Sequence, residues 1–201
     1  ELINDEDAIR KYRRAMVRKA PLLSELVGDD WPRYDALLAE HGMPREARAH
    51  LKPWAALLIL VRPPESPGII LDLLLLADAR NRGKQVVALE SIDEQIAAMN
   101  DLPEDTQLAL LRHAEANYDR IQLSFQPLLR AYLGHDLSGM WQTNVEAMGA
   151  EEALAEHNRR FLDSLLFARN LRFAERLAPL VERGGCFAAF GALHLYGPRG
   201  V

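Results

Sequence analysis

The chain has 201 residues, 49% of them hydrophobic and 26% charged, which is an ordinary globular composition and predicts a single domain. Its formal net charge of −5 argues against a nucleic-acid partner, because such proteins carry a basic face. No apolar run reaches the ~18 residues needed to span a membrane. The one cysteine, Cys186, cannot form an internal disulfide and is expected to be a small buried apolar residue.

The first part of the chain is predicted to be mainly helical. Residues 6–27 form a charged amphipathic stretch, and residues 55–61 are apolar all round, which is typical of a buried helix. Residues 62–68 contain three prolines and a glycine and predict a loop. A further helix over 69–82 is expected to end at Gly83, because glycine favours helix C-termini.

A strand is predicted over residues 85–89. The run is short, apolar and contains β-branched residues, and it lies between a helix stop and a helix start, as strands buried on both faces do. Directly after it, Ser91 and Glu94 have the spacing of a capping box, which begins a helix. This succession of helix, strand and helix is typical of α/β proteins.

The remainder of the chain extends the same pattern. Long helices are predicted over 103–133 and 149–182, followed by a second buried strand over 186–192. The expected fold class is therefore α/β and helix-rich, with a small, mostly parallel central sheet flanked by many helices. Two strands cannot form a stable sheet alone, so we expect a further strand ending at residues 1–3 or strands outside the chain. The start without Met and the end after a glycine turn suggest truncation at both ends.

Three ionisable residues are expected at one edge of this sheet. Ligands bind at the carboxyl ends of parallel strands, and the predicted strand ends carry Glu1, Glu90 and His194. Carboxylates and an imidazole suit general acid–base catalysis or the binding of a divalent metal. The alternatives are that Glu90 only stabilises a helix start through the helix dipole, and that His194 is only hydrogen-bonded in a turn.

A row of arginines is predicted on the last long helix. Arg169, Arg172 and Arg176 are spaced i, i+3 and i+7, so they share one helix face. Such a row usually forms a solvated, salt-bridged surface. Arg169, however, lies among apolar residues, where a guanidinium needs a carboxylate partner or a ligand.

The C-terminal residues 187–201 closely resemble the signature of the TraB/GumN (TraB/PrgY/GumN) family. In that signature a Gly-x-x-His motif, here Gly191 to His194, is followed by a turn and Gly-Val. Further motifs match in order over nearly the whole chain: Lys52-Pro53-Trp54-Ala55, Leu71-Asp72, Leu89-Glu90-Ser91 with Glu94-Gln95, and Arg169-Asn170.

This resemblance implies both a fold and a site. The family is grouped with Tiki-type metalloproteases, erythromycin esterases (EreA) and ChaN-like proteins, which are thought to use two Gly-x-x-His motifs, a glutamate and an arginine. The Tiki branch is described as dependent on manganese or cobalt. By position His194 matches the second motif histidine, Glu1 the glutamate and Arg169 the arginine. The first Gly-x-x-His motif is absent and is expected upstream of Glu1. The resemblance also favours a bacterial protein that is periplasmic or secreted.

Residues and resemblance together predict a metal-dependent hydrolase, a peptidase being one form, that acts on a peptide or small-molecule substrate. Glu1 and His194 would bind Mn, Co or Zn, Glu90 would bind the metal or activate water, and Arg169 would stabilise an oxyanion. Two alternatives stay open, namely a non-catalytic protein that binds a ligand or peptide on the same fold, and a helical interaction module. A vacant polar cleft around His194 would favour catalysis, whereas a ring packed under Phe or Trp would favour binding.

Overall fold

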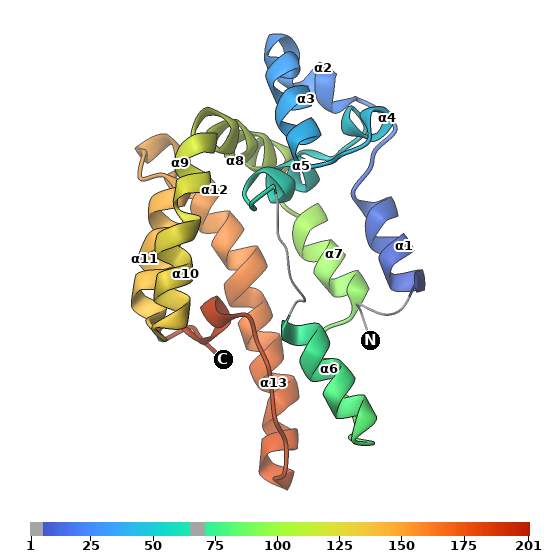
Figure 1. The fold of residues 1–201 in the computed structure, drawn as a ribbon, viewed down its shortest axis with the longest axis vertical. Coiled ribbons are helices and arrows are strands. Elements are labelled where there is room, and N and C mark those ends of the chain that lie inside the picture. The colour runs from blue at the N-terminus through green and yellow to red at the C-terminus, as the bar shows by residue number, and fades with distance from the viewer. Residues whose placement is uncertain (1–5, 65–70) are drawn as a thin grey trace.

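The computed structural model describes residues 6–64 and 71–201 (Figure 1). In this part of the chain η1 and η3 are short 3-10 helices and η2 is a π-helical turn. The elements are, in chain order, α1 (Glu6–Ala15), α2 (Leu23–Val27), η1 (Gly28–Asp30), α3 (Trp31–Glu40), α4 (Arg45–Arg48), α5 (Pro53–Leu60), α6 (Leu71–Asn81), α7 (Ile92–Asn100), α8 (Glu104–Ala116), α9 (Tyr118–Leu123), α10 (Phe125–Leu133), α11 (Leu137–Met148), α12 (Glu152–Leu162), η2 (Asp163–Phe167), α13 (Ala168–Arg183) and η3 (Ala192–Leu195).

The predicted central parallel sheet is wrong. Within the described ranges every regular element is a helix, and the β-type pairing found there is one isolated antiparallel bridge between Val17 and Leu51. A short apolar run becomes a strand only if a neighbouring strand supplies backbone hydrogen bonds. That requirement depends on residues far away in the sequence, so the local pattern cannot establish it. The fold is a helical assembly and not an α/β one.

The two predicted strands are extended segments that lie on the surface. Residues 85–88 are exposed, and Val87 keeps 49% of its surface accessible. In the second segment Phe187 is 81% exposed, and Cys186, which was expected to be buried, is exposed as well. Apolar composition therefore failed as a sign of burial at both segments.

Several helix predictions are confirmed. The long helices expected over 103–133 and 149–182 appear as α8–α10 and as α12–η2–α13. The helix expected over 69–82 corresponds to α6, while residues 65–68 of the predicted loop lie outside the described residues. The capping box is confirmed: Ser91 Oγ accepts from the Glu94 N–H at 3.2 Å, and Glu94 Oε2 accepts from the Ser91 N–H at 2.9 Å. These features depend on neighbouring residues in the chain, which makes them readable from sequence.

The hydrophobic core lies where α5 packs against α3 and α8. The predicted buried helix is confirmed, since nearly all α5 side chains are buried, including Trp54 at 1% exposure. The polar groups of Trp54 are satisfied as burial requires. Its backbone N–H donates to Gln107 Oε1 at 3.2 Å, and its indole Nε1 donates to Asn100 Oδ1 at 3.0 Å.

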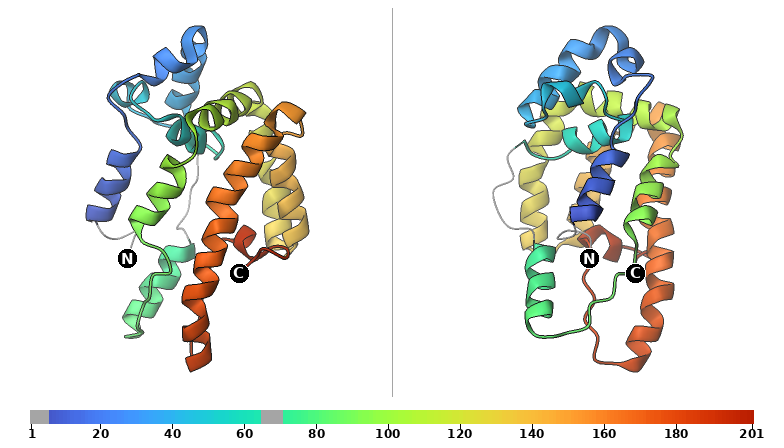
Figure 2. Two further views of the ribbon diagram at one scale, coloured as in Figure 1. Left: turned by 180° about the vertical axis from the view of Figure 1, so that it is seen from behind. Right: turned by 90° about the vertical axis from the view of Figure 1, so that its right-hand side faces the viewer.

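A long helical rod made of α12, η2 and α13 runs along the molecule (Figures 1 and 2). The pair α10 and α11 lies beside its upper part, and α8 crosses its upper end. Beyond α13 the chain reverses at Gly184 and Gly185, whose φ angles of 74° and 65° suit glycine. It then runs back along α13 to η3. The rod thus positions residues from its middle against both the segment before α7 and the end of the chain.

None of the helices in residues 6–64 and 71–201 combines the length and the continuous hydropathy that crossing a bilayer requires.

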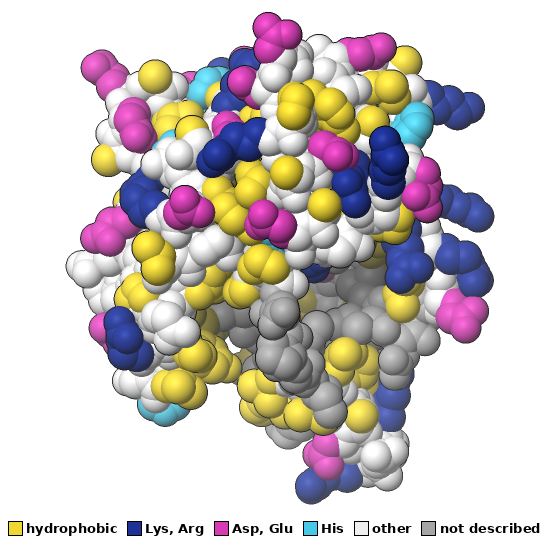
Figure 3. Space-filling view, turned by 45° about the horizontal axis from the view of Figure 1, so that its top comes forward, with side chains coloured by type: hydrophobic (Ala, Val, Ile, Leu, Met, Phe, Trp, Pro, Cys, Tyr) yellow, Lys and Arg dark blue, Asp and Glu magenta, His cyan; other side chains and the backbone are white. Residues whose placement is uncertain are grey.

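On the face shown in Figure 3, Lys and Arg side chains are interspersed with Asp and Glu side chains.

Candidate functional site

Glu90 forms a buried ion-pair cluster with two arginines of α13. Its side chain is 7% exposed and lies directly before the Ser91 cap of α7. Arg169 donates from Nε to both carboxylate oxygens, at 3.0 and 3.1 Å, and from Nη2 to Oε2 at 2.7 Å. Arg172 donates from Nη2 to Oε1 at 3.0 Å. Two guanidinium groups therefore bind the carboxylate that the sequence predicts as a base or metal ligand. Hydrogen bonds between a guanidinium and a carboxylate are charge-assisted, and they are stronger than hydrogen bonds between neutral groups.

Arg176 continues the arginine row along the same segment. It donates to the Leu89 carbonyl at 2.8 Å and forms a salt bridge with Glu94. The predicted common face is confirmed, because all three arginines of the row bind residues 89–94. Arg169 is the least exposed of them, at 14%, against 33% for Arg172 and 42% for Arg176. The carboxylate partner expected for Arg169 is Glu90.

His194 lies in η3 and contacts α13 through Asn170 and Phe173. Its Nδ1 is 2.6 Å from Oδ1 of Asn170, and the Asn170 Nδ2 donates to the carbonyl of Arg199 at 2.6 Å. Since that second bond uses the amide nitrogen, the oxygen faces the ring and Nδ1 must carry the proton. The His194 ring meets Phe173 edge-on, with centroids 5.3 Å apart. The histidine is thus both oriented by an amide and packed against a phenyl ring.

The electrostatics of the site keep His194 neutral. Burial, and then the positive charge of Arg169, lower the pKa of His194 to about 4, and the charge of Glu90 offsets only part of this. At neutral pH the ring is therefore uncharged, with its lone pair on Nε2. Within residues 6–64 and 71–201 no hydrogen bond engages Nε2. Such a nitrogen can accept a proton or bind a metal.

The structure brings Arg169 and His194 together around Phe173, with Glu90 bound to Arg169. The Arg169 guanidinium lies over the Phe173 ring at 5.4 Å from its centroid, and His194 meets the same ring. The cluster is organised by one helix, not by the sheet edge at which Glu90 and His194 were expected. Glu1, the remaining predicted ligand, lies outside the described residues.

Asn170 is the residue that sequence reasoning missed. It was noted only as the second half of an Arg-Asn pair, yet it is 2% exposed and holds the His194 ring. A buried asparagine in the middle of a helix needs partners for its amide. That signal becomes visible only once burial is known.

The π-helical turn η2 supports the cluster from the N-terminal side. Its Leu165 carbonyl accepts a hydrogen bond from Arg169 Nη1 at 3.0 Å. Its Asp163 forms a salt bridge with Arg199 at 3.0 Å, and the Arg199 guanidinium lies 3.7 Å from the Phe167 ring centroid. Turns of this type are frequent at functional sites. Here η2 fixes both Arg169 and the terminal loop whose carbonyl holds Asn170.

The described residues do not make a complete metal centre. Across 6–64 and 71–201 there is no group of three or more His, Cys, Asp or Glu side chains that could hold a metal ion. Nε2 of His194 fits one ligand position, because metal-binding histidines donate their other N–H to a fixed acceptor, as Nδ1 does to Asn170. Both oxygens of Glu90 already accept from arginine. The available donor set therefore fits a single ligand and not a whole site.

Comparison with known proteins gives a family and one named relative. The TraB/PrgY/gumN family matches residues 1–201. The chain is also similar to a protein of Danio rerio, "Metalloprotease TIKI2", with 30% identity over 153 residues. The match covers 66% of this chain and 30% of that relative, so the chain corresponds to under a third of the relative's length. No solved structure matches the chain.

Proposed function

The chain belongs to the TraB/PrgY/gumN family, as its motifs predicted, and from that premise we propose that the protein is a hydrolase that cleaves peptide bonds, with His194 in its active site. The relative named as a metalloprotease supports this reaction class. The observation that carries the proposal is the neutral His194 ring, whose Nδ1 is bound to Asn170 and whose Nε2 lone pair is available.

His194 is proposed to act through Nε2. A general base must be deprotonated at the working pH and must be held in one tautomer. The lowered pKa of about 4 leaves the ring deprotonated at neutral pH but makes it a weak base, and the Asn170 amide holds the ring in one tautomer. In the hydrolytic step Nε2 would accept a proton from the attacking water and later return it to the leaving amine.

Arg169 is proposed to stabilise negative charge that develops on the substrate. A guanidinium has five N–H donors, and Arg169 directs four hydrogen bonds from three nitrogens to Glu90 and Leu165. One N–H on each terminal nitrogen remains for a substrate oxygen. Glu90 then acts as a positioning residue that fixes the guanidinium, instead of the base or metal ligand that we first expected.

A divalent metal, Mn, Co or Zn, is proposed as a cofactor because the TIKI2 relative is named a metalloprotease. Nε2 of His194 has a single lone pair, so it would act either as the base or as a metal ligand. When Nε2 binds the ion, the ion would activate the water in place of the ring, and Glu1 is the other residue of this chain that we expect to contribute. The bound ion would supply Lewis-acid polarisation. Calorimetric titration with each metal tests this directly: loss of metal binding in His194→Ala supports the assignment, and unchanged binding refutes it.

Peptide hydrolysis can be tested with the purified protein and a fluorogenic peptide library, with each metal supplied. We expect His194→Ala to lower kcat/KM by about 10²-fold or more, the usual scale for removing a general acid–base group. The matched control is His135→Ala, since His135 is exposed on a turn. Cleavage that is unchanged in His194→Ala would contradict the proposal.

A non-catalytic ligand-binding role is the second candidate. It is favoured by the edge-on packing of His194 against Phe173, which is the environment of a structural histidine. Under this alternative, His194→Ala would weaken ligand binding or stability, and no peptide in the library would be cleaved by the unaltered protein.

A further inference from the structure

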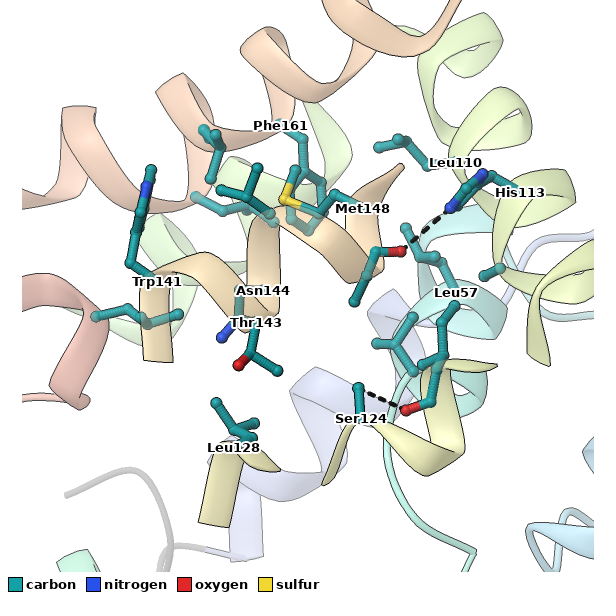
Figure 4. Close-up of a pocket in the computed structure, with 18 of the residues that line it drawn as sticks. Leu57, Leu110, His113, Ser124, Leu128, Trp141, Thr143, Asn144, Met148 and Phe161 are labelled. Carbon is teal, nitrogen blue, oxygen red and sulfur yellow. Dashed lines mark hydrogen bonds between the residues drawn. The ribbon is translucent and has the colours of Figure 1, made fainter. Parts of the chain in front are cut away.

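An apolar cavity lies beside η2 and η3, the two short elements that flank the candidate site. Its volume is about 330 Å³, at the lower end of the range for ligand pockets. Its walls come from α5, α8, α9, α10, α11, α12, η2 and η3, and Figure 4 shows side chains that surround the hollow. Protein interiors have few voids larger than a water molecule. A hollow of this size, walled by several helices and partly open to solvent, is therefore a candidate binding site and not a packing fault.

The lining has one chemical character. Large apolar side chains such as Leu128 and Phe161 face the hollow, and Phe125 also lines it. The four polar lining residues already bond backbone carbonyls: His113 to Ala147 at 3.1 Å, Ser124 to Ile121 at 2.6 Å, Thr143 to Gly139 at 2.8 Å and Asn144 to Met140 at 2.8 Å. The cavity therefore presents hydrocarbon and little free hydrogen-bonding capacity.

This character discriminates between classes of ligand. A peptide segment would carry amide groups into the cavity, and burying an amide without a hydrogen bond is costly. An unbranched hydrocarbon chain has no such groups, and its burial is favourable in proportion to its apolar area. We propose that the cavity binds the aliphatic chain of one free fatty acid, with the carboxylate left in solvent.

The cavity shares walls with the candidate site. Leu193, which lines the hollow, directly precedes His194. Trp141 also lines it and stacks on Tyr196, with ring centroids 5.4 Å apart. A bound chain would thus contact Leu193 directly and would be linked to Tyr196, on the far side of His194, through Trp141. This binding site is independent of the proposed hydrolysis.

Trp141 makes the proposal directly testable. A bromine atom quenches indole fluorescence on contact, so the probe is ω-bromododecanoic acid, titrated below its micelle concentration. We expect saturable one-to-one quenching. Trp141→Phe should remove the quenching while calorimetry still detects binding. Quenching that persists in Trp141→Phe, or the absence of saturable binding, would overturn the proposal.

A matched pair of variants tests whether the fatty-acid chain binds inside the cavity. Leu128 lines the cavity, whereas its neighbour Leu129 is 51% exposed. Leu128→Glu should weaken fatty-acid binding at least tenfold, because the hydrocarbon chain would bury the carboxylate of the new glutamate. Leu129→Glu should leave fatty-acid binding unchanged. Ala147→Phe, which fills the hollow, gives a second test should Leu128→Glu fail to fold. Equal binding by the cavity variants and the control would refute the site.

A separate experiment tests whether the bound hydrocarbon chain belongs to a free fatty acid or to a membrane lipid. Flotation with phosphatidylcholine vesicles should recover no protein if the ligand is a free fatty acid, and recovery with vesicles alone would contradict that source. An apolar peptide that competes with the fatty acid at equal or lower concentration would also overturn the assignment.

Discussion

Two polar clusters on α13 differ in how they handle charge. On one side the Glu90 carboxylate is buried between Arg169 and Arg172, so its charge is matched by permanent cations. On the other side His194 is uncharged, with one nitrogen bound to Asn170 and the other available. The charged cluster has little left to offer a substrate except two N–H groups of Arg169. Under the proposed function, proton transfer would belong to the neutral cluster, and the charged cluster would fix the geometry and the electrostatic field of the site.

The largest effect is expected from breaking the charged cluster. Glu90→Gln leaves two guanidinium groups without a counter-ion in a largely buried position, and removing one partner of a buried pair costs about 3–5 kcal/mol. Urea denaturation measures this loss. The control is Glu94→Gln, because the Glu94–Arg176 pair is more exposed, and it should cost much less. Equal losses in both variants would show that burial does not distinguish the pairs.

The neutral cluster should give stability a characteristic pH dependence. The folded-state pKa of His194, about 4, lies below its ordinary value of 6.5. The unfolded chain therefore binds more protons between these values, and stability falls as pH drops from 6.5 to 4, by about 3 kcal/mol at most. Because carboxylates titrate in part of this range, the measurement is the difference between the unaltered protein and His194→Gln. Parallel stability curves for the two proteins would contradict the lowered pKa.

A smaller effect is expected when the amide that orients the ring is removed. Asn170→Ala leaves Nδ1–H of His194 and the Arg199 carbonyl without their partner, at a cost of about 1–3 kcal/mol. Activity should fall about tenfold, as for other residues that orient a functional histidine. Asn170→Asp keeps an acceptor but adds charge, so it should raise the pKa of His194. An unchanged pKa in Asn170→Asp would refute the contact.

The smallest effect concerns the outer arginine of the charged cluster. Arg172 makes one bond to Glu90, and its buried Nε has no hydrogen-bond partner within the described residues. Arg172→Met should therefore cost about 1 kcal/mol or less, and clearly less than Arg169→Met, which removes every Arg169 bond to Glu90. Thermal unfolding of the two variants ranks them, and the reverse order would contradict this division of roles.

A feature could be predicted from the sequence when the residues that determine it lie close together in the chain. The Ser91–Glu94 cap and the buried helix α5 were readable because their determinants lie within a few residues. The sheet was mispredicted because pairing of residues 85–89 and 186–192 depends on distant partners. Glu90 and His194 were selected from the ends of strands that do not form, whereas Arg169 was selected from the arginine row on the last long helix. Their proximity comes from α13, and the burial of Asn170 could not be inferred from periodicity.

The most direct test of the account is nuclear magnetic resonance of the His194 ring in protein labelled with ¹⁵N-histidine, titrated with pH. The account predicts a proton on Nδ1, an unprotonated Nε2 at neutral pH, and a pKa near 4. A proton on Nε2, or a pKa at or above the ordinary value of 6.5, would contradict it.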